Sequence, residues 1–589
     1  MVHQFHIPVL GLGFSIDTPL KVAKYGVSSV VSIVDDELAE RMRAHHSREA
    51  GEAYHPIPKT ASDSRAKRIT AYLNLLNRLV DQRFEALKQL PFEPGNALCT
   101  YFELLPDTAP LKHGYELMME FPEGERKTIF QNLLRMQMEK GAIDVNIMSK
   151  VDRINPKYQS DFADTENTEA LTALRGFAQS DLSSSLTLSA GMNPRLYTYI
   201  TRFNDFFPDH RQQLKKKIML KVSDFRSALI QAKFLAKKGL WVSEFRVESG
   251  LNCGGHAFAT DGYLLGPILE EFKQNRQAMR SELFQMYQAA LQEKGISLAE
   301  APEQHLSVQG GIGTAEENTF LLKQYALRST GWGSPFLLVP EVTNVDTDTL
   351  GKLAEAGESD FYLSNASPLG IPFNNFKGSS MEQERLRRIA EGKPGSPCTK
   401  KYLVSNTEFT KEPICTASNK YQQRKITALK AMNLPAEELE REVAAVTEKI
   451  CLCEGLCSSS YQRIGLLKPK ENKAVAICPG PNLAYFSSVY SFSQMVDHIY
   501  GRINLLDSVN RPHVFMKELE LYVNYLQTEV GSLLRNFNEK KKAQLLKFKE
   551  QLQAGIHYYR EQAHSWSFDK PAIVGMLQKA ENNLALTLL

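Results

Sequence analysis

Short apolar segments alternate, along the N-terminal part of the chain, with stretches that have the period of amphipathic helices. This alternation is typical of parallel α/β folds, where helices cover both faces of the sheet and its strands become nearly continuous apolar runs. Eight segments meet this description: Ile7–Gly11, Ser29–Val34, Ile143–Met148, Leu186–Ser189, Ile218–Val222, Trp241–Val247, Leu306–Gln309 and Pro335–Val339. Because eight parallel strands close a barrel, the sequence predicts a (β/α)8 TIM barrel.

A long, largely helical stretch separates the second segment from the third. Apolar residues recur there at steps of three and four, and Ser62, Asp63 or Ser64 is placed to cap the helix. The apolar positions are Ile69, Leu73, Leu76, Val80, Phe84 and Leu87. We therefore expect a helical insertion over about 37–140, which is open to interpretation as a lid, an interface or a layer packed on the core.

The chain changes character after the last predicted strand. From Asn344 to about Pro413 it is rich in Gly, Pro, Ser and Asn, and so long an irregular stretch is usually functional. From Tyr421 onward the pattern is helical again, with Leu545, Phe548, Leu552 and Ile556 forming one stripe. The predicted organisation is a barrel over 1–345, a covering segment over 346–420 and a cysteine-containing helical C-terminal region over 421–589.

Composition narrows the possible functions. A formal net charge of +3, with basic and acidic residues interspersed, argues against nucleic acid as a partner. No apolar run reaches the ~20 residues that cross a bilayer, and the N-terminus lacks the pattern of a secretory signal, so a cytoplasmic location is expected. We expect the eight cysteines to be thiols or metal ligands rather than a disulfide framework.

Two glycine-rich loops lie where a barrel of this kind often binds phosphate. Gly310-Gly311-Ile312-Gly313-Thr314 follows the seventh predicted strand, and Gly331-Trp332-Gly333-Ser334-Pro335 leads into the eighth. Glycine lets the backbone approach an anion closely, and the helix that follows directs its free N–H groups at it. Their position on consecutive strands predicts an anion site.

His256 follows two glycines directly after the sixth predicted strand. Its titration near neutrality suits it to proton transfer. A histidine that merely bonds a loop carbonyl is the alternative interpretation.

In this order, these features resemble the nitronate monooxygenase (2-nitropropane dioxygenase) family and its longer relatives, the flavin-dependent enoyl reductases of fatty-acid and polyunsaturated fatty-acid synthesis. The resemblance covers roughly Ile7 to Asn375 without the insertion. The matching residues are Ile7-Pro8-Val9, Thr18-Pro19-Leu20 with Ala23, Asp144-Val145-Asn146, Gly254-Gly255-His256, Gly310-Gly311-Ile312 and Gly333-Ser334-Pro335-Phe336.

The resemblance implies a flavin mononucleotide (FMN) across the barrel mouth, with His256 beside it as base or substrate-orienting group. The phosphate would meet Gly311, Gly333 and Ser334, and the ring would lie near Gly11, Gly13, Asn146 and Lys221. The full set of implied cofactor residues is Gly11, Gly13, Asn146, Lys221, Gly254, Gly255, Gly310, Gly311, Gly333 and Ser334. NAD(P)H is the electron donor that the enoyl reductases imply.

The chain departs from the family pattern in front of its Gly-Gly-His. Asn252 and Cys253 replace an acidic residue and an alanine, and Ser334 replaces a threonine but keeps the hydroxyl. The long insertion and the C-terminal region are nearer to the lipid-synthesis relatives.

A cysteine cluster, Cys451, Cys453 and Cys457 with Cys478 beyond it, could bind zinc or an iron–sulfur cluster. Its spacing matches neither a usual zinc pair nor a ferredoxin run, so we expect core thiols and no metal. A Cys-x-Cys before Gly-Leu also occurs in the longer relatives, which hints at a structural role near the active site.

Two hypotheses follow. The first is an FMN-dependent oxidoreductase that acts on an activated carbon acid, such as a nitronate, or reduces an acyl/enoyl thioester; a homo-oligomer is compatible with it. The second is a barrel that has kept the phosphate site but lost turnover and serves as a binding or assembly subunit.

Overall fold

The computed structural model describes residues 2–149, 152, 166–189, 191–257, 261–535, 537–566 and 570–587. Eight parallel strands form a closed barrel in sequence order, and β8 pairs with β1 to close it. The strands are β1 (Phe5–Ile7), β2 (Ser28–Ser32), β3 (Ile143–Ile147), β4 (Ser184–Leu188), β5 (Lys216–Val222), β6 (Val242–Glu248), β7 (His305–Gln309) and β8 (Ser329–Gly331). The predicted TIM barrel is therefore confirmed.

Seven of the predicted strands overlap the observed ones, but the eighth is wrong. Pro335–Val339 is not a strand, because Ser334–Leu338 form a buried 3-10 helix, η4, in which Pro335 occupies the first turn. The true β8 lies immediately before Trp332 and pairs Thr330 with Phe5. The glycine loop 331–335 consequently follows strand eight rather than preceding it.

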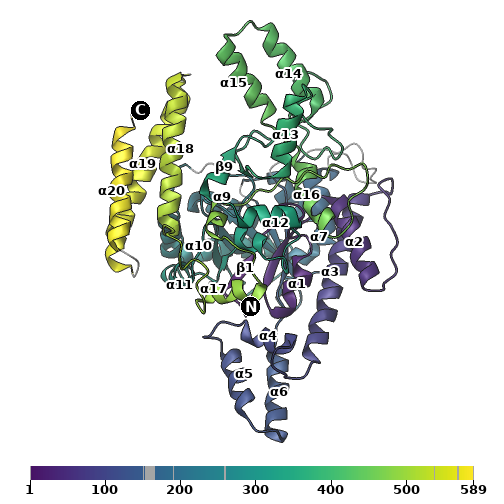
Figure 1. The fold of residues 1–589 in the computed structure, drawn as a ribbon. Helices are drawn as coiled ribbons and strands as arrows, with labels where there is room; N and C mark the ends of the chain where they lie inside the picture. Colours follow the sequence, from purple (N-terminus) through teal and green to yellow (C-terminus); the bar gives the residue numbers. More distant parts are fainter. Residues whose placement is uncertain are drawn as a thin grey trace.

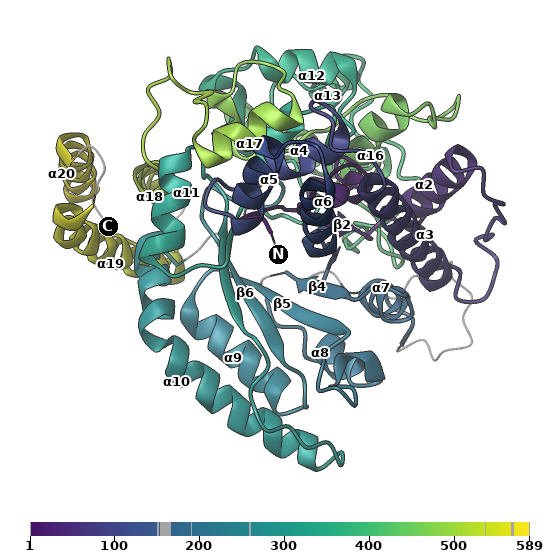
Figure 2. The ribbon, with the colours of Figure 1, turned by 90° about the horizontal axis from the view of Figure 1, so that it is seen from below.

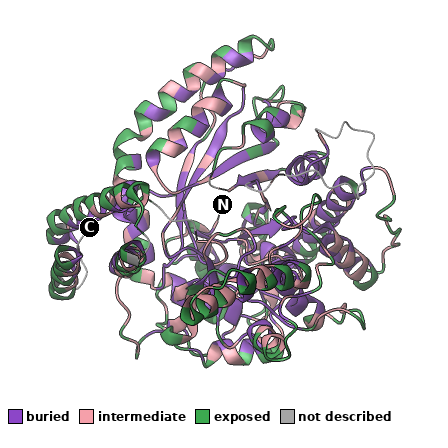
Figure 3. Cartoon of the chain, turned by 90° about the horizontal axis from the view of Figure 1, so that it is seen from above, coloured by how far each residue is buried: buried purple, intermediate pink, exposed green. Residues whose placement is uncertain are grey.

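Helices surround the barrel on the outside, as Figure 2 shows for α8, α9 and α10 beside β4, β5 and β6. Figure 3 shows the strands buried and the outer faces of these helices exposed. The helices of the barrel layer are α1 (Thr18–Val22), α7 (Glu169–Ala178), α8 (Pro194–Ile200), α9 (Phe225–Ala236), α10 (Leu265–Gln292), α11 (Ala315–Gln324) and α12 (Thr347–Ala354).

The barrel interior is partly polar. This differs from the expectation that the strands would be nearly continuous apolar runs. In β6, Phe245 and Val247 alternate with Glu244 and Arg246, and Phe245 packs on Phe272 of α10 with ring centroids 5.8 Å apart. Side chains of a strand alternate between its two faces, so Glu244 and Arg246 point inward, where they form an ion pair of 2.8 Å.

The predicted helical insertion after strand two is present. It comprises α2 (Asp36–Glu49), α3 (Ser64–Lys88), α4 (Ala97–Glu103), α5 (Pro110–Glu120) and α6 (Glu125–Gln137). The apolar stripe of α3 is buried, but its expected capping is wrong in detail. Asp63 precedes the helix at φ 51°, and its side chain accepts none of the helix N–H groups because its carboxylate pairs with Arg175 of α7 at 2.8 Å.

Helices α4, α5 and α6 enclose a second small hydrophobic core with Val2 and Tyr25. In Figure 1 they project from the end of the molecule where the N-terminus lies. Since Val2 and Tyr25 precede β1 and β2, this core lies at the amino ends of the strands, away from the carboxyl ends where the site is expected.

The stretch expected to be irregular after the barrel is more ordered than its composition suggests. It contains α12, the antiparallel hairpin β9 (Phe361–Ser364) and β10 (Phe373–Phe376), and α13 (Ser380–Ala390). Beyond it lie α14 (Asn419–Ala431), α15 (Ala436–Thr447), α16 (Leu452–Arg463) and α17 (Phe492–Tyr500).

Three C-terminal helices, α18 (Val514–Arg535), α19 (Glu539–Gln562) and α20 (Lys570–Leu586), stand side by side along one flank of the barrel. The stripe Leu545, Phe548, Leu552 and Ile556 is buried, as its spacing predicts. Among the described helices, none is both long enough and apolar enough to cross a membrane.

Candidate functional site

A cavity of about 1090 Å³, including its open mouth, lies at the carboxyl ends of the barrel strands. Residues of four separate strand ends line it: Gly11, Asn146, Lys221, Gly254, Gly255 and His256. These six belong to the residues that the sequence assigned to the cofactor ring and to proton transfer. A mostly apolar cavity with a few convergent polar groups is typical of a site for a small organic ligand or cofactor.

The loop after β6 presents His256 to this cavity. Gly254 and Gly255 have φ values of +114° and +82°, which favour glycine, and a Cβ on Gly254 would lie 2.1 Å from the carbonyl oxygen of Cys478. Beyond them, the Nε2 atom of His256 lies 2.7 Å from the Ser367 hydroxyl. The imidazole is thus held by a side chain rather than by a loop carbonyl at Nε2.

Asn252, one of the two departures from the family pattern, organises this turn. Its Oδ1 accepts the backbone N–H of Gly254 at 2.8 Å and the side-chain amide of Asn374 at 3.0 Å. An amide can accept these bonds without bringing a charge into a buried position. The substitution is therefore compatible with an ordered Gly-Gly-His turn.

Lys221 contributes the charge of the cavity wall. Its ammonium lies 2.9 Å from the Glu248 carboxylate, which also accepts an N–H of Gln309 at 2.7 Å. Glu248 ends β6 and Lys221 lies on the neighbouring strand β5, so strand register brings the pair together.

Much of the remaining wall comes from parts of the chain that sequence reasoning did not assign to the site. Its members are Leu369, Ile371, Phe373, Tyr402, Leu403, Leu452, Cys453, Leu456 and Cys478. The one signal that pointed here was the Cys-x-Cys before Gly-Leu in α16. The covering segment and the C-terminal region are thus part of the cavity rather than appendages to the barrel.

The residues expected to hold a phosphate do not line this cavity. Gly310, Gly311, Gly333 and Ser334 are buried. Gly13, which was expected near the flavin ring, does not line the cavity either, because it is packed under α16 with its N–H bonded to the carbonyl of Leu456. The Ser334 hydroxyl donates to the carbonyl of Cys253 at 3.0 Å and accepts the N–H of Gly480 at 2.7 Å. The segment Cys478–Asn482 thus crosses directly over the glycine loops.

Arg511 closes the loop after β7 from outside. Its guanidinium forms a buried 2.6 Å ion pair with Glu317 and donates a hydrogen bond to the carbonyl of Gly311. Glu317 in turn accepts the N–H of Gly313 at 2.8 Å. Burial alone would raise the pKa of Glu317, but the neighbouring Arg511 outweighs it and the net shift is downward. A carboxylate of the chain therefore already occupies one N–H of this loop.

Some backbone N–H groups at these loops have no acceptor among the residues that the structure describes. In the described part of the chain, the structure records no hydrogen bond from the backbone N–H groups of Gly311, Ile312 or Gly333. Unpaired buried N–H groups are costly, which suits them to an anionic ligand. For the expected FMN, the cavity offers polar groups to a ring, whereas the donors left for a phosphate lie beneath the 478–482 segment.

Seven of the eight cysteines are buried and Cys398 is partly exposed, with its thiol hydrogen-bonded to that of Cys415. Cys453 and Cys478 line the cavity, and the Cys457 thiol lies 3.4 Å from Asp35. Burial raises the pKa of Cys451 and of Cys478 to about 12, which keeps these groups as neutral thiols. Cys253 is likewise buried, against Gly333, and burial raises its pKa well above that of a free thiol.

A second cavity of about 780 Å³ adjoins the first. Aromatic side chains dominate its lining: Phe361, Tyr362, Tyr522, Tyr525 and Phe548. Residues around the start of β10 alternate between the two cavities, since Ile371 and Phe373 line the first whereas Pro372 and Asn374 line the second. One strand therefore forms part of the wall between them.

No protein-family model matches this chain. No curated protein matches it either. A mutant of FabK from Thermotoga maritima is similar in structure at 11% identity and a TM-score of 0.30, over 68% of this chain and 82% of that one. The enoyl reductase domain of MlnA, from the macrolactin biosynthesis cluster of Bacillus amyloliquefaciens, is similar at 14% identity and a TM-score of 0.31, over 74% and 87%.

Proposed function

We propose that this chain is an FMN-dependent oxidoreductase whose ring site is the cavity at the carboxyl ends of the strands. One observation carries the proposal. One cavity is lined by Gly11 after β1, Asn146 in β3, Lys221 in β5 and the Gly254–His256 turn after β6, all of which the family resemblance places at or beside a flavin. A bound flavin would supply the electron or hydride transfer that no side chain provides.

The chain's own residues supply proton handling and positioning. The Nε2 atom of His256 shares a hydrogen bond with the Ser367 hydroxyl, so a proton can be held or passed at that atom. Phe373 packs edge-on against the imidazole with ring centroids 5.0 Å apart, which restricts its rotation. Leu369 and Ile371 make the cavity wall beside it apolar.

The phosphate end would be held by the N–H groups of Gly311 and Gly333 and by the Ser334 hydroxyl. Since that hydroxyl now accepts the N–H of Gly480, phosphate binding has to displace this contact. We therefore expect slow FMN uptake by the apoprotein, and weaker binding of riboflavin, which lacks the phosphate.

The aromatic cavity beyond β10 favours an acyl or enoyl thioester over a small carbon acid as the substrate. An apolar chain would gain about 25 cal/mol for each Å² that it buries there, whereas a nitronate has little surface to bury. NAD(P)H is the electron donor we propose for this reaction. We therefore expect enoyl thioesters rather than nitronates to be turned over. Among the thioesters, long-chain ones should react faster than short ones.

The alternative is a barrel that binds without turnover. The specific observation in its favour is that the chain's own residues Cys253, Gly480 and Arg511 cover the glycine loops. Under this alternative the protein would take up flavin, or an anion, and remain inert to electron donors.

The test is an absorbance spectrum of the purified chain before and after addition of FMN, followed by anaerobic NADPH and an enoyl thioester. We expect a flavin spectrum, bleaching by the donor and recovery by the thioester. His256→Ala should keep the flavin but lose recovery, Ser367→Ala should lose it in part, and the exposed His210→Ala should behave as wild type. A protein that takes up no FMN refutes the proposal, and a yellow but inert protein favours the alternative.

A further inference from the structure

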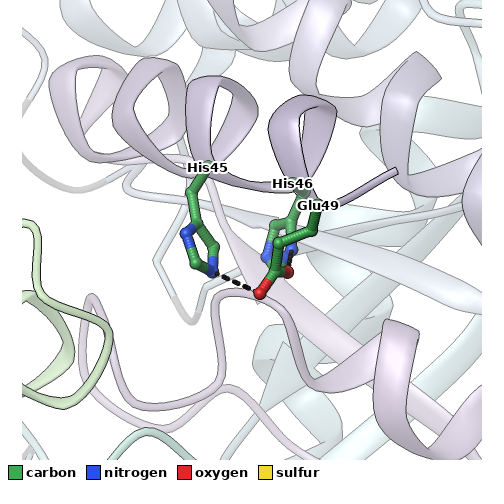
Figure 4. Close-up of side chains that lie close together, drawn as sticks. All are labelled: His45, His46 and Glu49. Atoms are coloured by element: carbon green, nitrogen blue, oxygen red, sulfur yellow. Dashed lines mark hydrogen bonds and ion pairs between the residues drawn. The ribbon is translucent and has the colours of Figure 1, made fainter. Parts of the chain in front are cut away.

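Three potential metal ligands meet at the C-terminal end of α2, outside the cavity. They are His45, His46 and Glu49, and Figure 4 shows all three side chains extending from the same helix end. Each offers one donor atom, and these atoms lie within 4.8 Å of one another. Among the described residues, no other set of three or more His, Cys, Asp or Glu side chains meets this condition.

The donor atoms lie close enough to share one ion, although Nδ1 of His46 and Glu49 are also within hydrogen-bond distance of each other. The two oxygens of Glu49 lie 3.3 Å from Nε2 of His45 and 3.2 Å from Nδ1 of His46. Hydrogen bonds from N–H to oxygen are usually near 2.9 Å, whereas donors bound tetrahedrally to zinc at about 2.0–2.2 Å lie roughly 3.3 Å apart. Both Glu49 contacts therefore already match the spacing of zinc ligands, and the two ring nitrogens, within 4.8 Å of each other, would be drawn together by the ion.

The other ring nitrogen of His46 has the partner that a metal-bound histidine usually has. Its Nε2 atom faces a carboxylate oxygen of Asp17 at 3.3 Å, an ion-pair distance outside hydrogen-bond geometry. Asp17 is itself fixed by Lys21 at 3.0 Å and by the amide of Asn344 at 2.7 Å. A carboxylate behind a ligating histidine sets its tautomer and orientation, and this one leaves Nδ1 of His46 available toward Glu49.

We propose that His45, His46 and Glu49 bind a divalent transition-metal ion, with zinc the best match to the donor set. Two imidazoles and one carboxylate suit zinc, cobalt or nickel, whereas calcium and magnesium prefer oxygen donors throughout. His46 is 5% exposed but Glu49 belongs to the exposed residues, so an ion has access from solvent and a water can complete its coordination.

Such an ion would brace the loop that precedes α1. Asp17 is the N-cap residue of α1 and ends the segment that begins at Gly11 and Leu12 on the cavity wall. Through His46 and Asp17, the ion would connect the end of α2 to that segment. Its role would be structural, since none of the three ligands lines the cavity.

The test is calorimetric titration of the full-length, chelator-treated protein with ZnCl2 in the presence of a non-metal-binding reductant, and separately an absorption spectrum with Co²⁺. We expect one zinc per chain and a cobalt spectrum of nitrogen and oxygen ligands. His45→Ala, at a partly exposed position, and Glu49→Gln, at an exposed one, should each weaken zinc binding about tenfold or more.

His113→Ala is the matched control, because His113 faces Glu116 at 3.4 Å on α5 without a second histidine. It should leave zinc affinity unchanged. Failure of the wild type to bind zinc stoichiometrically, equal binding by wild type and His45→Ala, or a thiolate-to-cobalt absorption band would each overturn the proposal. None of these outcomes depends on the flavin, so this inference and the proposed function fail separately.

Discussion

Glu518 of α18 joins the C-terminal helices to the loop that carries the Gly-Gly-His turn. Its buried carboxylate accepts the N–H of Gly250 at 2.6 Å and that of Leu265 at 2.7 Å. Burial raises the pKa of Glu518 from 4.5 to about 7, although the two hydrogen bonds oppose the shift. We therefore predict that replacing Glu518 with glutamine changes how stability depends on pH.

The sign follows from proton uptake. Between pH 4.5 and 7 the folded chain holds a proton on Glu518 that the unfolded chain has lost, so the free energy of unfolding falls as pH rises. A pKa raised by about 2.5 corresponds to about 3 kcal/mol over the whole window. The glutamine of the Glu518→Gln variant does not titrate, and since its amide offers one carbonyl acceptor for two N–H groups, it costs a pH-independent ~1–3 kcal/mol.

The expected result is that wild type exceeds Glu518→Gln in stability at pH 5 and that this difference shrinks by about 3 kcal/mol by pH 8. Urea unfolding of both proteins across that range, followed by tryptophan fluorescence, measures it. Glu520→Gln is the control, because Glu520 lies on the same helix but is 42% exposed beside Lys517. A wild-type minus Glu518→Gln difference that stays constant from pH 5 to 8 would refute the reasoning.

Three further predictions concern the packing around the site and the barrel. Gly254→Ala should destabilise the fold far more than Gly255→Ala. A Cβ on Gly254 would lie 2.1 Å from a backbone carbonyl oxygen, whereas a Cβ on Gly255 would meet no described atom within 4 Å; equal melting temperatures of the two variants would contradict this. Arg511→Met should cost about 3–5 kcal/mol in urea unfolding by leaving Glu317 buried and unpaired, and adding Glu317→Gln should recover part of it. Burial lowers the pKa of Lys216 from 10.5 to about 7, so between pH 7 and 10 the unfolded chain holds a proton that the folded chain has lost. The free energy of unfolding of the wild type should therefore rise with pH relative to that of Lys216→Met, and a difference between the two proteins that does not change with pH would contradict this prediction.

The positions of seven strands could be predicted from the sequence because each is a short apolar segment ended by a turn. The eighth could not, since the apolar run after Pro335 looks like a strand by composition alone. The true β8, Ser329–Gly331, has only three residues and owes its place to pairing with β7 and β1. Such pairing is a property of the closed barrel and has no local signal.

The candidate site divides in the same way. Gly254, Gly255 and His256 come shortly after a strand, as their sequence pattern indicates. Because the carboxyl ends of all strands of a parallel barrel meet at one face, it could be predicted that these residues lie near Asn146 and Lys221. The cover of the glycine loops could not, because Gly480 and Arg511 lie far along the chain from Ser334 and Gly311.

By itself, the sequence determined the barrel, its helical insertion and the strand ends that face one mouth, because these depend on periodicity and on glycines within a few residues. Only the tertiary structure decided which walls close the cavity, how the glycine loops are covered and that His46 faces Asp17 across two elements. Those contacts join residues distant in sequence, and their energy comes from burial and charge pairing that exist only once the chain has folded.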